Sequence, residues 1–262
     1  MSYQIAVQMF SVRREFEADP VGTLKKLRKI GFTAVEMAGY NGLPAAYFKG
    51  ILDTLGMKAV AGHLSKETVE NDPERVLDDL RTLETKYLVV PYLIGHFHPG
   101  GERFAEAVEF FNTMGKHFLE KGIELLFHNH EDEFRYKTNG DYNLDVLYSS
   151  TDPEYLKAEL DAGWASYAKV DVVKYIPKYN GRLPVIHLKD FSWCKEGEKG
   201  NCRYDINTCA LGEGDVDMKG IINAAKAAGT TVFVIEQDEP DTGDIFGCLK
   251  VGFDNLTKLL AE

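Results

Sequence analysis

Short apolar runs recur along the chain, each preceded by a glycine and by a segment whose apolar residues have helical spacing. Five of these junctions read KIGFTAVEM, TLGMKAVAGH, EKGIELLFHNH, NGRLPVIHLKD and AAGTTVFVIE. Glycine suits the left-handed position that ends a helix, and an apolar run bounded by turn residues is typical of a buried strand. The pattern therefore predicts helices that alternate with buried parallel strands.

Three further apolar runs, at residues 4–8, 87–92 and 155–161, complete a set of eight predicted strands. Eight strand–helix units in 262 residues give about 33 residues each, which is typical of a (β/α)8 TIM barrel. An open doubly wound sheet normally has fewer strands, and no glycine-rich phosphate-binding fingerprint follows the first predicted strand. We therefore predict an α/β fold in which residues 1–262 form a single TIM-barrel domain.

One long segment, residues 191–215, is irregular and contains Gly, Asn and charged residues. Because it follows the seventh predicted strand, we predict a loop or lid on the rim of the barrel. Cys194, Cys202 and Cys209 lie in this segment at spacings that match no familiar zinc-binding pattern, and we expect them to be thiols. Cys248 lies in a predicted helix and is expected in the core.

Four of the predicted strands end in an ionisable side chain, namely His128, Asp161, His187 and Glu236. The carboxyl ends of the strands of a parallel barrel converge on one rim, so these side chains are expected to meet there. Ionisable groups are rarely buried unless they are paired or bind a metal. A mixed set of nitrogen and oxygen ligands favours Mn²⁺, Co²⁺, Zn²⁺ or Fe²⁺ over Mg²⁺. We therefore predict one divalent metal ion held by these four residues.

Further polar residues lie at the other predicted strand ends or directly after them. Each alone has a structural explanation, such as a hydrogen bond within the core or to a neighbouring strand. Together they would line the same rim, where they are candidates for contacts to a substrate. Side chains two residues apart on a strand point the same way, so His130 is expected beside His128. The candidate substrate-binding residues are Gln8, Glu36, His63 and Lys189.

Several segments resemble the sugar phosphate isomerase/epimerase family of xylose-isomerase-like TIM barrels. They are QMFSVR, HNHEDEF, ELDAGW, NGRLPVIHLKD, LGEGDVDM and VIEQDEP, in the subgroup with an HNH segment at strand five. The resemblance covers nearly the whole chain. It implies a divalent metal held by Glu, Asp, His and Glu at the ends of strands five to eight, and Asp161, His187 and Glu236 match the last three.

The chain departs from this family pattern at two positions. His128 stands where the resemblance implies a Glu, so either His128 binds the metal directly or Glu133 reaches back to it. Trp164 stands where sugar epimerases of the family often have His. A Trp at the rim can stack on a sugar or inositol ring, or it can pack between barrel and helix. Trp164 is therefore a further candidate for substrate binding.

The chemistry that such a site supports is proton abstraction next to a carbonyl, with a metal that stabilises the enediolate. Glu236 is the first candidate base, and His130 or Glu133 are alternatives. The first prediction is an isomerase or epimerase of a ketose or keto-polyol. The alternative is a lyase or dehydratase of a keto-inositol or 3-keto-glycoside, and a minor alternative is a carbohydrate-binding barrel without catalysis. An endonuclease needs more histidine ligands and basic residues than the seven His of this chain suggest.

The net charge of the chain limits the classes of partner that it is expected to bind. The 30 basic and 41 acidic side chains give a net charge of −11, which repels nucleic acids and anionic membranes. We expect neither as a partner, and predict instead an unphosphorylated sugar or polyol, because no phosphate cradle is visible in the sequence. No apolar stretch approaches the roughly 20 residues of a membrane span, so we expect a cytoplasmic protein of carbohydrate metabolism. The sequence is compatible with a homo-oligomer.

Overall fold

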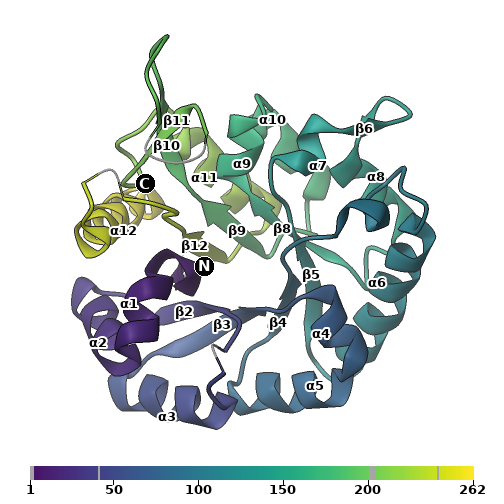
Figure 1. Ribbon diagram of the computed structural model, residues 1–262, viewed down its shortest axis with the longest axis horizontal. Helices are drawn as coiled ribbons and strands as arrows, with labels where there is room; N and C mark the ends of the chain where they lie inside the picture. The colour runs from purple at the N-terminus through teal and green to yellow at the C-terminus, as the bar shows by residue number, and fades with distance from the viewer. Residues whose placement is uncertain (1–2, 41, 201–203, 241) are drawn as a thin grey trace.

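Eight parallel strands close into a barrel in the computed structural model, which describes residues 3–40, 42–200, 204–240 and 242–262 (Figure 1). The strands follow one another around the barrel in chain order, and the last pairs with the first. The predicted TIM-barrel fold is confirmed. The barrel strands are β1 (Gln4–Gln8), β2 (Ala34–Ala38), β3 (Lys58–His63), β4 (Tyr87–Val90), β5 (Glu124–His128), β8 (Lys157–Asp161), β9 (Val185–Leu188) and β12 (Val232–Ile235).

Helices surround the strands on the outside of the barrel (Figure 1). None of the described helices is long and apolar enough to cross a membrane. The main helices are α2 (Pro20–Ile30), α3 (Ala45–Leu55), α5 (Pro73–Thr82), α6 (Phe104–Leu119), α8 (Asn143–Ser150), α11 (Met218–Ala228) and α12 (Ile245–Ala261). Shorter helices lie in the connections, namely α1 (Arg13–Ala18), α4 (Lys66–Asn71), α7 (Asp132–Arg135), α9 (Ala162–Tyr167) and α10 (Val172–Tyr175), with the 3-10 helices η1 (Met9–Val12), η2 (Gly95–Phe97) and η3 (Ile176–Tyr179).

The glycines at the predicted helix-to-strand junctions all have positive φ angles, although Gly31 lies outside the left-handed helical region. Their φ angles run from +61° at Gly56 to +133° at Gly31. Gly56 and Gly229 end α3 and α11 in the left-handed conformation, which residues with a Cβ atom rarely adopt. The five junctions lie at Gly31, Gly56, Gly122, Gly181 and Gly229.

Two apolar layers hold the barrel together. The outer layer lies between strands and helices and includes the fully buried Phe111, Phe127 and Phe233. The inner layer fills the barrel with smaller side chains such as Ala6 and Val89. The ionisable side chains lie near the carboxyl ends of the strands, above this apolar filling, which leaves them little contact with water.

The structure corrects two parts of the sequence-based prediction. Two barrel strands are shorter than predicted, since β4 ends at Val90 before Pro91 and β8 begins at Lys157. Residues 191–215 are not an irregular loop, because β10 (Asp190–Trp193) and β11 (Ile206–Cys209) pair as an antiparallel hairpin. The hairpin extends outward beyond the ring of helices in Figure 1.

The cysteines agree with the expectation where the structure describes them. Cys194 and Cys209 are thiols on or beside the hairpin, the first half-buried and the second buried. Cys248 is buried on α12, so its predicted place in the core is confirmed. Cys202 lies outside the described residues.

Candidate active site

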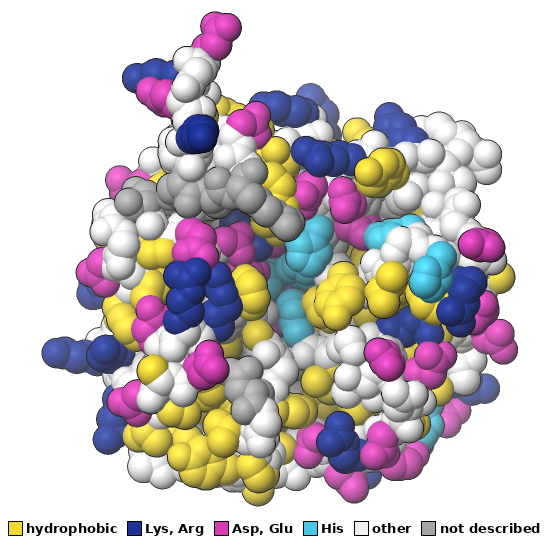
Figure 2. Space-filling model, in the orientation of Figure 1, with side chains coloured by type: hydrophobic (Ala, Val, Ile, Leu, Met, Phe, Trp, Pro, Cys, Tyr) yellow, Lys and Arg dark blue, Asp and Glu magenta, His cyan; other side chains and the backbone are white. Residues whose placement is uncertain are grey.

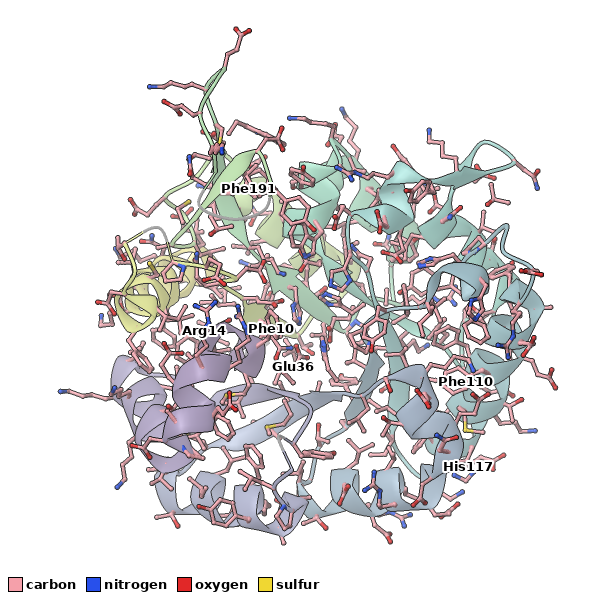
Figure 3. The ribbon with its side chains drawn as sticks, in the orientation of Figure 1. Phe10, Arg14, Glu36, Phe110, His117 and Phe191 are labelled. Carbon is pink, nitrogen blue, oxygen red and sulfur yellow. The ribbon has the colours of Figure 1, made fainter. Side chains whose placement is uncertain are left out.

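Strand alternation brings carboxylates and imidazoles into the barrel at its carboxyl end. Glu159 and Asp161, two residues apart on β8, are both fully buried. His128 of β5 lies beside Glu159 in the sheet register, and His187 of β9 lies beside Asp161. Figure 2 shows histidine side chains in a hollow at the centre of this face, and Figure 3 places Glu36 of β2 at the same centre.

The structure brings the four predicted metal ligands together. His128 Nε2 lies 3.7 Å from Asp161 Oδ2, and His187 Nδ1 lies 2.9 Å from Glu236 Oε2. One donor atom from each of the four residues lies within 4.8 Å of all the others. All four side chains are buried. We call these four residues the upper group.

Lys189 is a buried cation beside the upper group. Its Nζ lies 3.4 Å from Asp161 Oδ2, 3.2 Å from Glu236 Oε2 and 3.1 Å from Asp238 Oδ2. Burial works against the charge, but Asp238 and Glu236 outweigh it and raise the pKa of Lys189. The sequence indicated Lys189 as a candidate substrate contact but not its partner Asp238.

A second group of side chains lies beneath the first, around one carboxylate oxygen. Glu159 Oε1 lies 2.8 Å from His63 Nε2, 3.0 Å from His128 Nδ1 and 3.1 Å from His187 Nε2. Glu36 contacts His187 and lies 3.2 Å from His63 Nε2. We call His63, Glu36 and Glu159 the lower group.

Two residues of the lower group, Glu159 and Glu36, and the neighbouring Gln8 bear on the sequence-based predictions. Glu159 was missed, although its spacing of two residues from Asp161 was a usable signal. Gln8 and Glu36, predicted to bind substrate, are buried at 1% and 0% exposure, and Gln8 donates a 2.9 Å hydrogen bond to Glu36. Direct contact of either residue with a substrate stays a prediction.

Burial and neighbouring charges set the protonation of the imidazoles. Burial, and then His187, holds the pKa of His128 well below its usual value. Burial, with Lys189 nearby, lowers the pKa of His130 to about 4. Burial also opposes the charge on His63, but Glu36 and Glu159 raise its pKa to about 9. At neutral pH His128 and His130 are therefore neutral and His63 is protonated.

The surroundings shift the pKa values of the Asp161 and Glu236 carboxyl groups in opposite directions. Burial raises the pKa of Asp161 to about 6, against the pull of Lys189. Burial opposes ionisation of Glu236 as well, but Lys189 and His187 outweigh it and lower its pKa. Glu236 therefore stays ionised, and His187 and Lys189 hold its Oε2, which suits a ligand better than a proton acceptor.

Glu133, the alternative ligand at strand five, lies apart from the upper group. Its Oε2 accepts a 2.7 Å hydrogen bond from the backbone N–H of His130, and its Oε1 lies 3.5 Å from His98 Nδ1. The ring of His130 packs 5.1 Å from that of His128. Of the two candidates, His128 has the geometry of a ligand, and Glu133 supports the backbone that carries His130.

Trp164 lies at the mouth of the barrel between His130, a candidate base, and the cation Lys189. Its ring lies 4.7 Å from Lys189 Nζ and 6.3 Å from the ring of His130. Tyr204 of the hairpin segment packs on it at 5.0 Å and donates a 2.8 Å hydrogen bond to Glu131. Trp164 Nε1 is buried and has no hydrogen-bond partner in the part of the chain that the structure describes. The hairpin thus forms one wall of the mouth, as expected for a segment on the rim.

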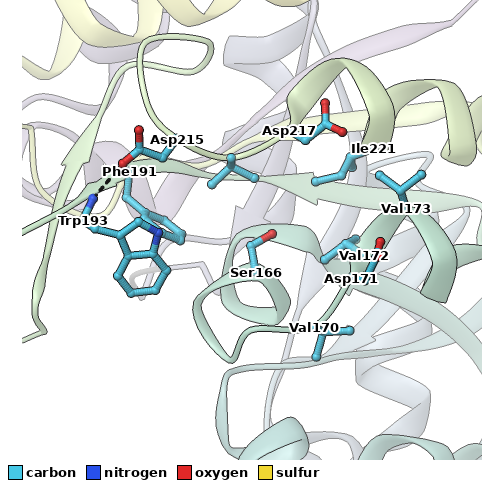
Figure 4. A pocket seen from close by; sticks show the side chains of 11 residues that line it. Ser166, Val170, Asp171, Val172, Val173, Phe191, Trp193, Asp215, Asp217 and Ile221 are labelled. Atoms are coloured by element: carbon cyan, nitrogen blue, oxygen red, sulfur yellow. Dashed lines mark hydrogen bonds between the residues drawn. The ribbon is translucent and has the colours of Figure 1, made fainter.

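A separate cavity of about 230 Å³ lies on the outer side of the hairpin (Figure 4). Its lining includes Phe191 and Trp193 of β10, together with Asp171, Asp215 and Asp217. None of its lining residues belongs to the upper or the lower group. The candidate chemistry therefore lies in the barrel mouth and not in this cavity.

The donor set of the upper group fits a divalent cation. Asp161 Oδ2 is buried and lacks a hydrogen-bond partner among the described residues, although an imidazole nitrogen and an ammonium lie within 4 Å of it. Such an oxygen is satisfied by a cation with open coordination positions. Two imidazoles and two carboxylates are ligands that Zn²⁺, Co²⁺ and Mn²⁺ accept. Burial opposes the charge on His187, but Glu36 and Glu159 raise its pKa, so an ion has to displace a proton from this ring. Four buried carboxyl groups, Glu36, Glu159, Asp161 and Glu236, and the half-buried Asp238 lie in or beside the two groups.

Comparison with known proteins agrees with this barrel. The family described as xylose isomerase-like TIM barrel matches residues 24–250. The chain belongs to this family. An inosose dehydratase of Clostridium perfringens is 25% identical over 158 residues, which are 58% of this chain and 52% of that protein. The match thus spans about half the length of this relative.

Two solved structures share the fold of this family member over almost its whole length. A sugar phosphate isomerase/epimerase from Parabacteroides distasonis has a TM-score of 0.81 at 21% identity, covering 98% of this chain and 94% of its own. The zinc-bound IOLI protein has a TM-score of 0.72 at 12% identity, covering 98% of both chains. Similarity at this level concerns the fold. The narrower subgroup with an HNH segment stays a prediction.

Proposed function

We propose that this chain is a metal-dependent lyase that removes water or another small leaving group from a carbonyl-containing polyol, such as a keto-inositol or a 3-keto-glycoside. The observation that carries the proposal is the unlike pair beside Trp164, where the neutral imidazole of His130 and the ammonium of Lys189 lie near the same ring. Elimination needs one group that takes a proton and another that gives one. The inosose dehydratase relative supports the same reaction type.

The upper group would hold the metal ion. Donor atoms of His128, Asp161, His187 and Glu236 lie within 4.8 Å of one another there, and the zinc atom bound by the IOLI protein, which has the same fold, supports a divalent ion. When bound, a divalent ion supplies a Lewis acid that polarises the substrate carbonyl. The ligand types favour Zn²⁺, Co²⁺ or Mn²⁺ over Mg²⁺.

The side chains around Trp164 would move the protons. His130, neutral at pH 7 because burial lowers its pKa to about 4, accepts the proton from the carbon next to the carbonyl. That C–H bond breaks, a C=C bond forms, and the C–O bond to the leaving group breaks. Lys189 Nζ donates a hydrogen bond, and then a proton, to the departing oxygen. Trp164 offers an apolar face on which the sugar ring stacks and from which water is excluded.

An isomerase or epimerase, which the sequence placed first, is the second candidate. In an isomerisation His130 takes a proton from one carbon and returns it to the next, while the hydroxyl proton passes to the former carbonyl oxygen. Epimerisation calls for a second base on the opposite ring face, and His128, the residue at the strand-five position, is occupied by Asp161 and Glu159. Burying several ionisable side chains opposes folding, and a carbohydrate-binding role without catalysis does not explain why the chain has such a cluster.

Turnover with two substrate types tests the proposal. Metal-loaded protein is incubated with an inosose and with a 3-keto-glycoside in D2O, and products are followed by mass and by ultraviolet absorption. A lyase gives loss of water or of the aglycone and a new conjugated chromophore. Deuterium next to the carbonyl without such loss supports the isomerase or epimerase instead.

A variant pair assigns the base. His130→Gln is expected to lower kcat by about 10²–10⁴-fold, whereas His96→Gln, which changes an exposed histidine of the neighbouring η2 segment, is expected to leave turnover within twofold. Activity of His130→Gln within tenfold of the parent would remove His130 as the base.

A further inference from the structure

Three imidazole nitrogens converge on a single carboxylate oxygen beneath the upper group. Glu159 Oε1 lies 2.8, 3.0 and 3.1 Å from the nearest ring nitrogens of His63, His128 and His187. The three rings pack with centroids 4.6 to 5.5 Å apart. Glu159 is fully buried, and its second oxygen, Oε2, is buried without a hydrogen-bond partner in the structure.

An ionised carboxylate oxygen only accepts hydrogen bonds, so each nitrogen that faces it carries a hydrogen atom. His128 then has its hydrogen on Nδ1 and presents the lone pair of Nε2 to Asp161. His187 has one hydrogen on Nε2, facing Glu159, and one on Nδ1, facing the ionised Glu236, so an ion in the upper group would have to displace the Nδ1 hydrogen. The bare Nε2 of His128 and the Nδ1 of His187 both face the upper group. A carboxylate behind a histidine ligand is a common means of fixing the ring and its tautomer for a metal.

We propose that Glu159 is a positioning residue that holds His128 and His187 in the orientation and tautomer that a divalent ion in the upper group requires. This inference rests on the metal site of the proposed function. Glu159 fulfils the role for both imidazoles at once, because it reaches them from β8, the strand between β5 and β9. Glu36 contacts His187 from the other side but has no such contact with His128 among the described interactions.

His63 and Glu159 of the lower group, together with the two imidazoles of the upper group, could instead hold an ion, since His63, His128, Glu159 and His187 also have donor atoms within 4.8 Å of one another. Ions in both groups would require each shared imidazole to lose both ring hydrogens, which costs far more than the single deprotonation that one ion needs. The geometry therefore disfavours two ions at once. For a single ion the upper group fits better, because Glu159 Oε1 already lies within 3.1 Å of three imidazole nitrogens, whereas Asp161 Oδ2 lacks a hydrogen-bond partner among the described residues. Ion stoichiometry separates one occupied group from two, and Asp161→Asn, which changes the upper group alone, separates the upper position from the lower.

The test replaces the charge and keeps the shape. Glu159→Gln is compared with the parent for Zn²⁺ affinity by competition with a chromophoric chelator, and for the His128 tautomer by nitrogen-15 NMR of the ion-free protein. We expect Zn²⁺ to bind about 10–100-fold more weakly and His128 to lose its uniform Nδ1–H tautomer. Glu131→Gln, which changes a buried carboxylate that accepts from Tyr204, is the control and is expected to keep the parent affinity.

Unchanged affinity together with an unchanged tautomer in Glu159→Gln would overturn the inference. Two ions per parent chain, one of them lost in Glu159→Gln, would overturn it too, because Glu159 would then be a ligand. A parent that binds no ion removes the proposed metal-dependent function, while the tautomer of the ion-free protein still decides the role of Glu159. If Glu159→Gln does not fold, Glu159→Asp keeps the charge at a shorter reach, and a parent-like tautomer and affinity there count against the inference.

Discussion

Burial decides the state of single ionisable residues at this barrel mouth. Glu133 is 4% exposed, and burial raises the pKa of its carboxyl to about 7, although the backbone N–H of His130 donates to it. The folded protein therefore binds this proton more tightly than the unfolded chain does. The stabilising contribution is complete below the ordinary pKa of 4.5 and is lost as the pH rises through 7.

Replacing Glu133 with Gln should remove this pH dependence. The amide keeps an acceptor for the His130 N–H and never ionises, so the fall in unfolding free energy between pH 4.5 and 8 should shrink by on the order of 3 kcal/mol. Urea denaturation of ion-free protein across this range measures it. Glu102→Gln, at an exposed position, should retain the parent slope. A Glu133→Gln slope equal to that of the parent would contradict the buried-carboxyl explanation.

Lys189 should contribute much more to the free energy of unfolding in the ion-free protein than in the ion-bound protein. In the ion-free protein, Lys189→Met leaves Asp161, Glu236 and Asp238 without their cation, and the expected cost is about 3–5 kcal/mol. A divalent ion should reduce this cost, because it neutralises Asp161 and Glu236. Unfolding measured with and without Zn²⁺ tests this. The control Lys174→Met, at an exposed ion pair, should change stability by less than about 0.5 kcal/mol. An equally small effect of Lys189→Met would contradict the role of Lys189 as the cation that stabilises these carboxylates.

Alternation along strands made part of the site predictable at the residue scale. It placed His128, Asp161, His187 and Glu236 on one rim, and the structure brings them together. The same period also pointed to Glu159, two residues before Asp161, but a Glu one layer deeper reads as an ordinary polar residue until its neighbours are known. No sequence pattern could show which way Glu133 turns, because it follows the strand.

At the scale of elements, the hairpin β10–β11 differs most from the prediction. Its residues include Gly, Cys and charges, which read as a loop, yet Phe191 and Trp193 alternate with polar residues as a strand requires. Asp190 anchors the return of the chain, since its carboxylate accepts backbone hydrogen bonds from Gly212, Gly214 and Val216. Such contacts between distant segments are not encoded in local periodicity, which explains the missed element.

Replacing two helix glycines, Gly115 and Gly50, with alanine should change the stability of the protein in opposite directions, because their surroundings differ. A Cβ atom at Gly115 of α6 would lie 2.1 Å from the backbone oxygen of Tyr155, so Gly115→Ala should cost about 1–3 kcal/mol. Gly50 of α3 is exposed and has nothing within 4 Å of such an atom, so Gly50→Ala should add about 0.5–1 kcal/mol. Chemical denaturation compares both with the parent. A Gly115→Ala protein as stable as the parent would show that α6 does not pack as described.

At the scale of the whole molecule, repetition made the barrel predictable. Five glycine junctions and eight apolar runs left few alternatives, because parallel strands joined by helices close into a barrel or form an open sheet. The same repetition carries no information on chemistry. Reaction type depends on a few side chains at the mouth, and the relatives accordingly include both a dehydratase and an isomerase/epimerase.

The central claim is that the upper group binds one divalent ion. Titration of chelator-stripped protein with Zn²⁺ or Mn²⁺, followed by calorimetry and elemental analysis, tests it most directly. We predict one ion per chain for the parent and for Asp171→Asn, an exposed carboxylate of the outer cavity. Asp161→Asn should weaken binding by at least about 100-fold, as expected for loss of a charged ligand. A parent that binds no ion, or an Asp161→Asn protein that binds it as tightly as the parent, would contradict the claim.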